Sequence, residues 1–126
     1  MKVSILIPVY GVEQYIAECA RSLFNQTYRD LEFIFVDDCS PDNSISVLKK
    51  VLEDYPDRAS QMHIIRHETN KGVGTARQTA FTHATGECIM HADSDDLLPA
   101  DAVELLVGGM QKGAYDIVSG AYAEYR

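Results

Sequence analysis

Three aspartates close together, Asp93, Asp95 and Asp96, are the residues of this sequence best suited to binding a cation. Two like charges about 4 Å apart repel by about 4 kcal/mol at a partly shielded protein surface, so such a cluster favours a counter-ion. Carboxylate oxygens are the ligands that hard divalent ions prefer. The apolar run Cys88–Met90 leads directly into the aspartates, which indicates that a buried strand holds them. The sequence therefore predicts a divalent-cation site at the end of this strand.

The spacing of the aspartates predicts which of their side chains point in the same direction. On an extended backbone alternate side chains face the same way, so Asp93 and Asp95 are expected to point into one cleft while Ser94 points away. This arrangement suits one carboxylate on a ribose hydroxyl and the other on a metal ion. The alternative is a solvated acidic turn before a helix that starts at Pro99.

A second acidic pair, Asp37 and Asp38, follows the apolar run Leu31–Val36. The carboxyl ends of parallel strands share one rim, where open α/β sheets bind their ligands. One of these carboxylates can accept hydrogen bonds from the edge of a nucleotide base. The alternative is a local role, in which the pair helps Ser40 to cap the following helix.

The first apolar run ends at Pro8-Val9-Tyr10-Gly11, where the glycine permits a sharp turn. Tyr10 is left at the same rim and can stack on a flat base, although an ordinary tyrosine in a turn is the alternative.

A third block, Asn70–Arg77, contains two glycines and the cations Lys71 and Arg77, and could accommodate a phosphate or a base. It matches neither GxGxxG nor GxxxxGK[ST], so solvated cations beside a closely packed helix are the alternative. His91 lies near the acidic cluster, but the other histidines lie elsewhere in the sequence. We therefore expect His91 to be a packed residue rather than a metal ligand.

Short apolar runs alternate with amphipathic segments along the chain, which predicts βαβ units and a largely parallel sheet. The first helix should bury one stripe, from Ile16 to Phe24. Ser40 is expected to cap the second helix, and Gly86 to end the third in the left-handed conformation. The expected strands are Val3–Ile7, Leu31–Val36, Met62–Ile65, Glu87–Met90 and Asp116–Val118, and the expected helices are Glu13–Asn25, Pro41–Tyr55, Gly72–Thr85 and Pro99–Lys112.

The composition narrows the class of protein. With 126 residues, of which 46% are hydrophobic, the chain suits one compact domain. A net charge of -8 argues against a nucleic acid or an anionic membrane as the main partner, so an anionic ligand would need a bridging metal. The widely spaced Cys19, Cys39 and Cys88 indicate reduced thiols in a cytosolic protein, and no segment reaches the length of a membrane span.

Four blocks taken together resemble the family 2 glycosyltransferases of the GT-A fold, and they cover essentially the whole chain. The blocks are Val3–Tyr10, Phe35–Ser40, Asn70–Gly72 with Ala76-Arg77, and Ala92–Asp96. The resemblance implies an α/β, Rossmann-like fold with a mostly parallel sheet flanked by helices. It also implies a nucleotide-diphospho-sugar donor, expected to be a UDP-sugar, a Mn²⁺ or Mg²⁺ ion held by a DxD motif, and transfer with inversion. The DxD motif is Asp93-Ser94-Asp95.

The resemblance also assigns expected roles to individual residues. Pro8, Val9 and Tyr10 would line the base pocket, and Ser94 would belong to the donor site as the middle residue of the DxD motif. Glu13 would approach the nucleoside, Asp37 would hydrogen-bond the base, Lys71 would contact the nucleotide, Asp93 would reach the ribose or the metal, and Asp95 would be the principal metal ligand.

The chain departs from the family pattern at Gly11, where Asn is frequent, at Cys39, where Gly is frequent, and at His91, where an apolar residue is common. The family places its catalytic base and acceptor pocket after the DxD motif. We therefore expect residues 1–126 to be a donor-binding domain, incomplete at its C-terminus, and assign no catalytic base. The expected acceptor is a saccharide or a lipid-linked molecule. The expected location is cytoplasmic, with a peripheral position at the inner face of the membrane as the alternative.

Two other classes share some of these features. A phosphoacceptor receiver domain also binds Mg²⁺ through clustered aspartates, but its acidic pair follows the first strand, which here ends in Pro8-Val9-Tyr10. A sugar-phosphate nucleotidyltransferase opens with a glycine-rich basic loop. The corresponding segment here, Gly11–Gln14, is acidic.

Overall fold

The structure, a computed structural model, describes residues 1–111, 117–118 and 121–125. The chain alternates strands and helices as the apolar runs predict. The elements are β1 (Val3–Val9), α1 (Ile16–Phe24), β2 (Leu31–Asp37), α2 (Ser44–Leu52), the 3₁₀ helix η1 (Pro56–Gln61), β3 (Met62–Arg66), α3 (Val73–His83), β4 (Cys88–Ala92), α4 (Ala102–Gln111), β5 (Ile117–Val118) and β6 (Ala121–Tyr125). Residues Lys112 and Asp116, at the edges of two expected elements, lie outside the described residues.

The strands form one sheet in the order β3-β2-β1-β4-β6-β5. The first four strands of this order are parallel, which confirms the predicted βαβ arrangement. Strand β6 was not expected from the sequence, and it pairs antiparallel with both β4 and β5. In this order β1 is a central strand, and β4, which leads into the acidic cluster, is hydrogen-bonded along both edges.

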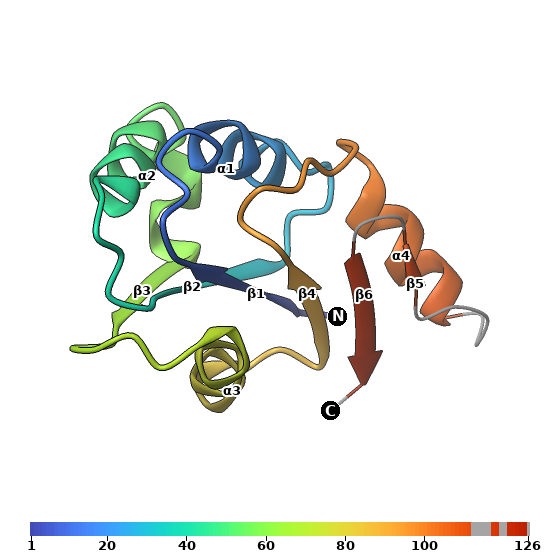
Figure 1. Cartoon of the computed structure of the whole chain (residues 1–126). Coiled ribbons are helices and arrows are strands. Elements are labelled where there is room, and N and C mark those ends of the chain that lie inside the picture. The colour runs from blue at the N-terminus through green and yellow to red at the C-terminus, as the bar shows by residue number, and fades with distance from the viewer. Residues whose placement is uncertain (112–116, 119–120, 126) are drawn as a thin grey trace.

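Helices cover both faces of the sheet: α1 and α2 lie on one side and α3 on the other (Figure 1). One core cluster joins alternate residues of β1, such as Ile5 and Ile7, to α1, α2 and α4. A smaller cluster joins Leu6 to Ala76 and Ala80 of α3. Both faces of β1 are therefore buried, which explains its largely apolar sequence, with Ser4 as the polar exception.

The predicted apolar stripe of α1 is confirmed. Its buried residues are Ile16, Cys19, Ala20, Leu23 and Phe24. Among the described residues, no helix combines the length and the apolar character needed to cross a bilayer.

The predicted cap of the second helix is wrong. The helix begins at Ser44, with Asn43 in the cap position, rather than after Ser40. The reason is a competing set of hydrogen bonds: Ser40 N donates to Asp37 Oδ1 at 2.9 Å and Ser44 N donates to Asp42 Oδ1 at 3.1 Å, so the chain bends between them. Ser40 Oγ instead accepts a hydrogen bond from Gly11 N at 3.1 Å, which ties two loops of the rim together.

Gly86 also differs from its prediction, because the described glycines with positive φ are Gly11 and Gly72. Its role is close packing between strands. A Cβ atom on Gly86 would lie 2.6 Å from Ser4 Oγ and 2.8 Å from Lys2 O. The absence of a side chain lets the start of β4 approach β1.

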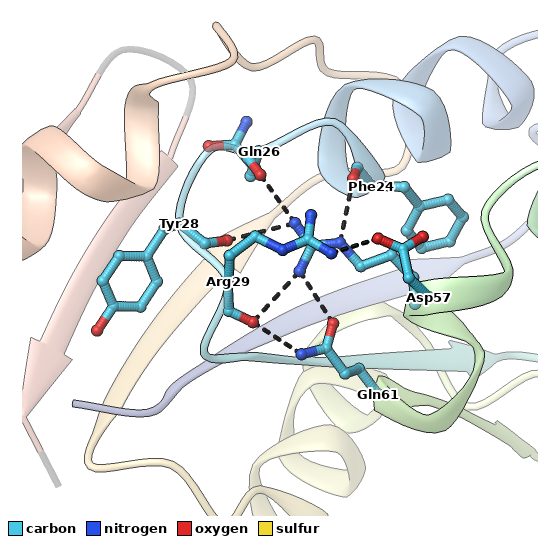
Figure 2. A network of polar contacts seen from close by, with 7 residues as sticks. Phe24, Gln26, Tyr28, Arg29, Asp57 and Gln61 are labelled. Carbon is cyan, nitrogen blue, oxygen red and sulfur yellow. Dashed lines mark hydrogen bonds and ion pairs between the residues drawn. The ribbon is translucent and has the colours of Figure 1, made fainter.

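A buried arginine that the sequence analysis overlooked fixes the connection between α1 and β2. Arg58 in η1 is fully buried. Its guanidinium donates to Phe24 O at 3.1 Å, to Gln26 O at 2.8 Å and to Gln61 Oε1 at 2.9 Å. Figure 2 shows these contacts, which place a cation at the C-terminal end of α1, where the helix dipole favours it.

Candidate functional site

A cavity of about 390 Å³ opens at the carboxyl ends of β1, β2 and β4, beside the start of α3. This is the rim at which the sequence predicts ligand binding. The lining residues are Pro8, Val9, Tyr10, Val12, Asp38, Asn70, Gly72, Val73, Ala76, Asp93, Ser94 and Asp95.

The cavity brings together most of the predicted site residues, namely Pro8, Val9, Tyr10, Asp93, Ser94 and Asp95. Glu13, Asp37 and Lys71 are not among its lining residues. Glu13 lies in a neighbouring hollow together with Tyr15 and Asp42. Its backbone N–H donates to Asp42 Oδ2 at 3.1 Å.

Tyr10 and Val73 are the most exposed apolar side chains that line the cavity. Both side chains are about half exposed, at 50% and 55%. Tyr10 follows the end of β1, and Val73 is the first residue of α3. An exposed aromatic ring and an aliphatic side chain lining one cavity offer a flat ligand a surface to stack on.

The acidic cluster is a turn rather than an extended segment, because Asp96 N donates to Asp93 O at 3.1 Å. The prediction that Ser94 points away is wrong: Ser94 is buried and lines the cavity. The turn brings one carboxylate oxygen from each of Asp93, Asp95 and Asp96 within 4.8 Å of one another. Three carboxylates therefore converge where the extended geometry predicted two.

The electrostatics of this turn fit a cation. Burial, followed by the charge of Asp93, raises the pKa of Asp96 above its usual value. Cys19 lies nearby and donates a long hydrogen bond from its thiol to Asp93 O, at 3.5 Å. Burial and then the charges of Asp96, Asp95 and Asp93 raise the pKa of this thiol to about 12. Oxygen ligands with an excess of negative charge are the donor set that Mn²⁺ and Mg²⁺ prefer.

Arg77 of α3 pairs with one member of the cluster. Its Nη2 atom donates to Asp93 Oδ1 at 2.7 Å. This contact fixes the direction of the Asp93 carboxylate and neutralises part of the charge of the turn. From the sequence, Arg77 was expected as a cation of the glycine-containing block and not as a partner of the aspartates.

Asp38, rather than Asp37, is the acidic residue of β2's end that lines the cavity. Asp37 is 7% exposed, and its Oδ1 accepts the hydrogen bond from Ser40 N. Alternation along β2 explains the difference: Phe35 faces the α1 side of the sheet, whereas Val36 faces α3. Asp38 continues the α3 face. Because every residue of β2 is buried, the sequence alone does not show which of the two aspartates continues this face.

The Asp38 carboxylate is held by backbone amides of the loop before α3. It accepts hydrogen bonds from Lys71 N and Gly72 N, both at 2.9 Å, and from His67 Nδ1 at 2.8 Å. Burial alone would raise the pKa of Asp38, but these hydrogen bonds outweigh it and lower the pKa. Asp38 is therefore an ionised acceptor in the wall of the cavity.

The two unusual residues of the rim occupy left-handed backbone positions. Gly11 has φ +62° and Cys39 has φ +59°. Gly and Asn tolerate this conformation well, so Gly11 suits its position, whereas Cys39 is the one non-glycine residue with positive φ in the described part of the chain.

Comparison with known proteins agrees with the four sequence blocks. The family model described as Glycosyl transferase family 2 matches residues 4–126. The glycosyltransferase GlyG of Streptococcus pneumoniae serotype 4 is 30% identical over 123 residues, which is 98% of this chain and 40% of that protein. These matches set aside the receiver and nucleotidyltransferase alternatives.

Two solved structures have the same fold. Staphylococcus aureus TarS, residues 1–349 in complex with UDP, superposes with a TM-score of 0.79 at 30% identity, covering 89% of this chain and 32% of that one. The mannosyltransferase PcManGT of Pyrobaculum calidifontis, in complex with GDP-Man and Mn²⁺, gives a TM-score of 0.74 at 33% identity, covering 83% and 32%. The chain spans less than half the length of each of these three proteins. From the family match and this architecture, the chain belongs to glycosyltransferase family 2 and has the GT-A fold.

Proposed function

We propose that this chain binds a nucleotide-diphospho-sugar together with a divalent metal ion, and that it forms the donor-binding part of an inverting glycosyltransferase. The observation that carries the proposal is one cavity lined by two chemically different sets of side chains. Tyr10 and Asp38 follow β1 and β2 and would supply a stacking surface and an acceptor, whereas the acidic turn follows β4 and would supply metal ligands. A nucleoside diphosphate has the matching order of groups, namely base, ribose and phosphates.

At the base end, Pro8, Val9 and Tyr10 would line the pocket, and Glu13 would approach the nucleoside from the neighbouring hollow. We assign the acceptor of the base's N–H groups to Asp38 instead of Asp37, because Asp38 lines the cavity and its pKa is low. A UDP-sugar is the proposed donor. Support comes from TarS, which is described in complexes with UDP and with UDP-GlcNAc.

At the phosphate end, Asp95 would be the principal ligand of Mn²⁺ or Mg²⁺. Arg77 holds Asp93 in one direction, so Asp93 would reach the ribose or share the metal. Lys71 lies before the first turn of α3 and would add a basic contact to the nucleotide. When bound, the metal would offset the negative charge that the leaving nucleoside diphosphate gains, which is worth several kcal/mol in comparable sites.

The acceptor is proposed to be a saccharide or a lipid-linked molecule in polysaccharide synthesis. Inversion requires a carboxylate that takes the proton of the acceptor hydroxyl. We assign no residue of this chain to that step.

Calorimetric titration with UDP, GDP and CDP, each with Mn²⁺ and again with EDTA, tests the proposal. The expected result is binding of UDP that requires the metal. Tighter binding of GDP would keep the donor site but change its base, as the GDP-Man complex of PcManGT would lead one to expect. No binding of any nucleotide would contradict the proposal for this chain.

A further inference from the structure

His67 connects the wall of the cavity to the helix behind it. The residue directly follows β3 and is 8% exposed. Its Nδ1 atom lies 2.8 Å from Asp38 Oδ1, and its Nε2 atom lies 2.8 Å from Thr79 Oγ1 in α3. Its backbone N–H donates to Asp37 O at 2.8 Å. One buried imidazole therefore links the ends of β2 and β3 to α3.

The proton positions in this chain of contacts follow from the chemistry of its members. An ionised carboxylate only accepts hydrogen bonds, so Nδ1 of His67 carries the proton that is donated to Asp38. In the neutral imidazole Nε2 is then an acceptor, and the Thr79 hydroxyl donates to it. The Asp38 carboxylate therefore selects the tautomer that presents N–H to it, and the Thr79 hydroxyl, which can donate or accept, adapts to that tautomer and holds the far side of the ring.

The contact matters for the cavity because Asp38 also holds the loop that forms the cavity wall. Its Oδ1 accepts from His67 and Lys71 N, and its Oδ2 accepts from Gly72 N. A carboxylate offers about four acceptor positions. Within the described part of the chain these three are the donors to Asp38, which leaves a position on Oδ2 for a ligand in the cavity.

Gly72 has no side chain to add to this wall. It lines the cavity with φ +94°, and a Cβ atom there would meet nothing within 4 Å. The wall at this point is therefore backbone, and its position depends on the carboxylate that binds the Lys71 and Gly72 amides. A shift of Asp38 moves both the acceptor and the wall.

We propose that His67 is a positioning residue of the donor site, which, together with Thr79, orients Asp38 so that its Oδ2 faces the base and its carboxylate holds the loop at Lys71 and Gly72. This inference rests on the proposed function. It adds that recognition of the base depends on a side chain that does not line the cavity.

Four variants test this role. His67→Phe removes both ring contacts and keeps the aromatic shape, and Thr79→Val removes the hydroxyl and keeps the branched shape. His67→Asn keeps an N–H donor at about the place of Nδ1 but loses the contact with Thr79. The matched control is His63→Phe, because His63 lies on β3, the strand that His67 follows, is half exposed, and contacts the carboxylate of Glu32 instead, with Nε2 3.4 Å from Oε1.

The first readout needs no ligand. Hydrogen exchange of the Lys71 and Gly72 amides, followed by NMR, is expected to quicken in His67→Phe and Thr79→Val and to stay unchanged in His63→Phe. The second readout is calorimetric affinity for UDP and for inorganic pyrophosphate, both with Mn²⁺. UDP affinity should fall about tenfold or more in His67→Phe, the range expected for losing a charge-assisted hydrogen bond, while pyrophosphate affinity should change little. His67→Asn should recover most of the loss.

The outcomes separate this inference from the proposed function. Unchanged amide exchange in the folded His67→Phe or Thr79→Val variant would overturn the inference, as would an equal loss of UDP and pyrophosphate affinity. If wild-type protein binds no nucleotide, the proposed function fails, and the exchange data alone support or overturn the role of His67 in holding the loop. If His67→Phe does not fold, Thr79→Val and His67→Asn decide.

Discussion

At the scale of single residues, Asp95 is the position where a substitution should affect metal binding without affecting the stability of the fold. Its side chain is exposed and belongs to a cluster of like charges. We expect Asp95→Ala to abolish metal-dependent nucleotide binding and to leave the free energy of unfolding within about 0.5 kcal/mol, as exposed substitutions usually do. Calorimetry with UDP and Mn²⁺, beside a urea titration, checks both parts. Equal affinity in the variant and the parent would remove Asp95 from the metal site.

Asp37 and Asp38 form a natural pair for testing base recognition. Asp38→Asn should weaken UDP binding much more than pyrophosphate binding. It should also cost about 1.5–3 kcal/mol of stability, because the amide has one acceptor oxygen and no charge, so it cannot keep both charge-assisted hydrogen bonds from Lys71 N and Gly72 N. Asp37→Asn is the matched control and should leave the UDP-to-pyrophosphate affinity ratio unchanged. Selective loss of UDP binding in Asp37→Asn would instead return the base contact to Asp37, as the sequence resemblance implies.

Residue types predicted where the cavity lies better than they predicted which side chains line it. Clustered aspartates at strand ends were sufficient to locate the rim, because few other features of a sequence require a cation. The choice between Asp37 and Asp38 depends on which face of β2 each side chain occupies. That choice follows from the alternation of Phe35 and Val36 between the two cores, which becomes visible only when the helices are assigned to faces.

At the scale of elements, Gly86 determines how closely β4 approaches β1. A methyl group on Gly86 would lie 2.8 Å from backbone atoms of both Lys2 and Ser4. We expect Gly86→Ala to cost about 1–3 kcal/mol, in the range of overpacked sites. The control is Gly74→Ala in α3, where a Cβ atom meets nothing within 4 Å and alanine should stabilise the helix by about 0.5–1 kcal/mol. Urea unfolding compares the two, and equal effects would contradict the packing role of Gly86.

Glu32 on β2 makes the stability of the sheet depend on pH. Burial would raise its pKa, but hydrogen bonds from Ser4 Oγ at 2.6 Å and from Thr85 N at 2.9 Å, with Lys2 nearby, lower it below the usual value. A carboxylate with a lowered folded-state pKa stabilises the protein above its unfolded pKa of about 4.3. This stabilisation is lost as the pH falls through the folded-state pKa.

The matching variant is Glu32→Gln, which keeps the shape and removes the charge. Urea titrations from pH 7 to pH 3 should show the variant less stable at pH 7, and the difference should shrink as the pH falls below about 5. A difference that stays constant over this range would mean that hydrogen bonding by shape alone, rather than ionisation, accounts for the contribution of Glu32.

The elements themselves were largely predictable, and their ends were not. Largely apolar runs identified the parallel strands, and β1 and β2 are buried along their whole length because both of their faces are covered. The start of α2 was missed because the Asp37 and Asp42 carboxylates accept hydrogen bonds from the backbone amides of Ser40 and Ser44. Which carboxylate binds which amide depends on the folded structure. Arg58 was overlooked because a single arginine in a polar segment reads as solvated, whereas here backbone carbonyls surround it.

At the scale of the whole molecule, the parallel order β3-β2-β1-β4 followed from the alternation of elements, whereas the antiparallel addition of β6 did not. A two-residue strand, Ile117–Val118, and its neighbour β6 carry too short a pattern to reveal their direction. The result is that β1 and β4, which carry Tyr10 and the acidic turn at their ends, are both interior strands. Tyr10 and the acidic turn of the proposed donor site therefore follow strands that are hydrogen-bonded to a neighbour on both sides.

The buried Arg58 has a consequence for how the chain acquires its structure during synthesis. The carbonyl groups that it binds belong to Phe24 and to the segment leading into β2, about thirty residues earlier in the chain. On the ribosome, the end of α1 and its turn into β2 have been made long before their guanidinium partner emerges. We therefore expect the turn between α1 and β2 to stay unstable until η1 has been translated. The segment from β1 to η1 should then fold in one late step instead of element by element.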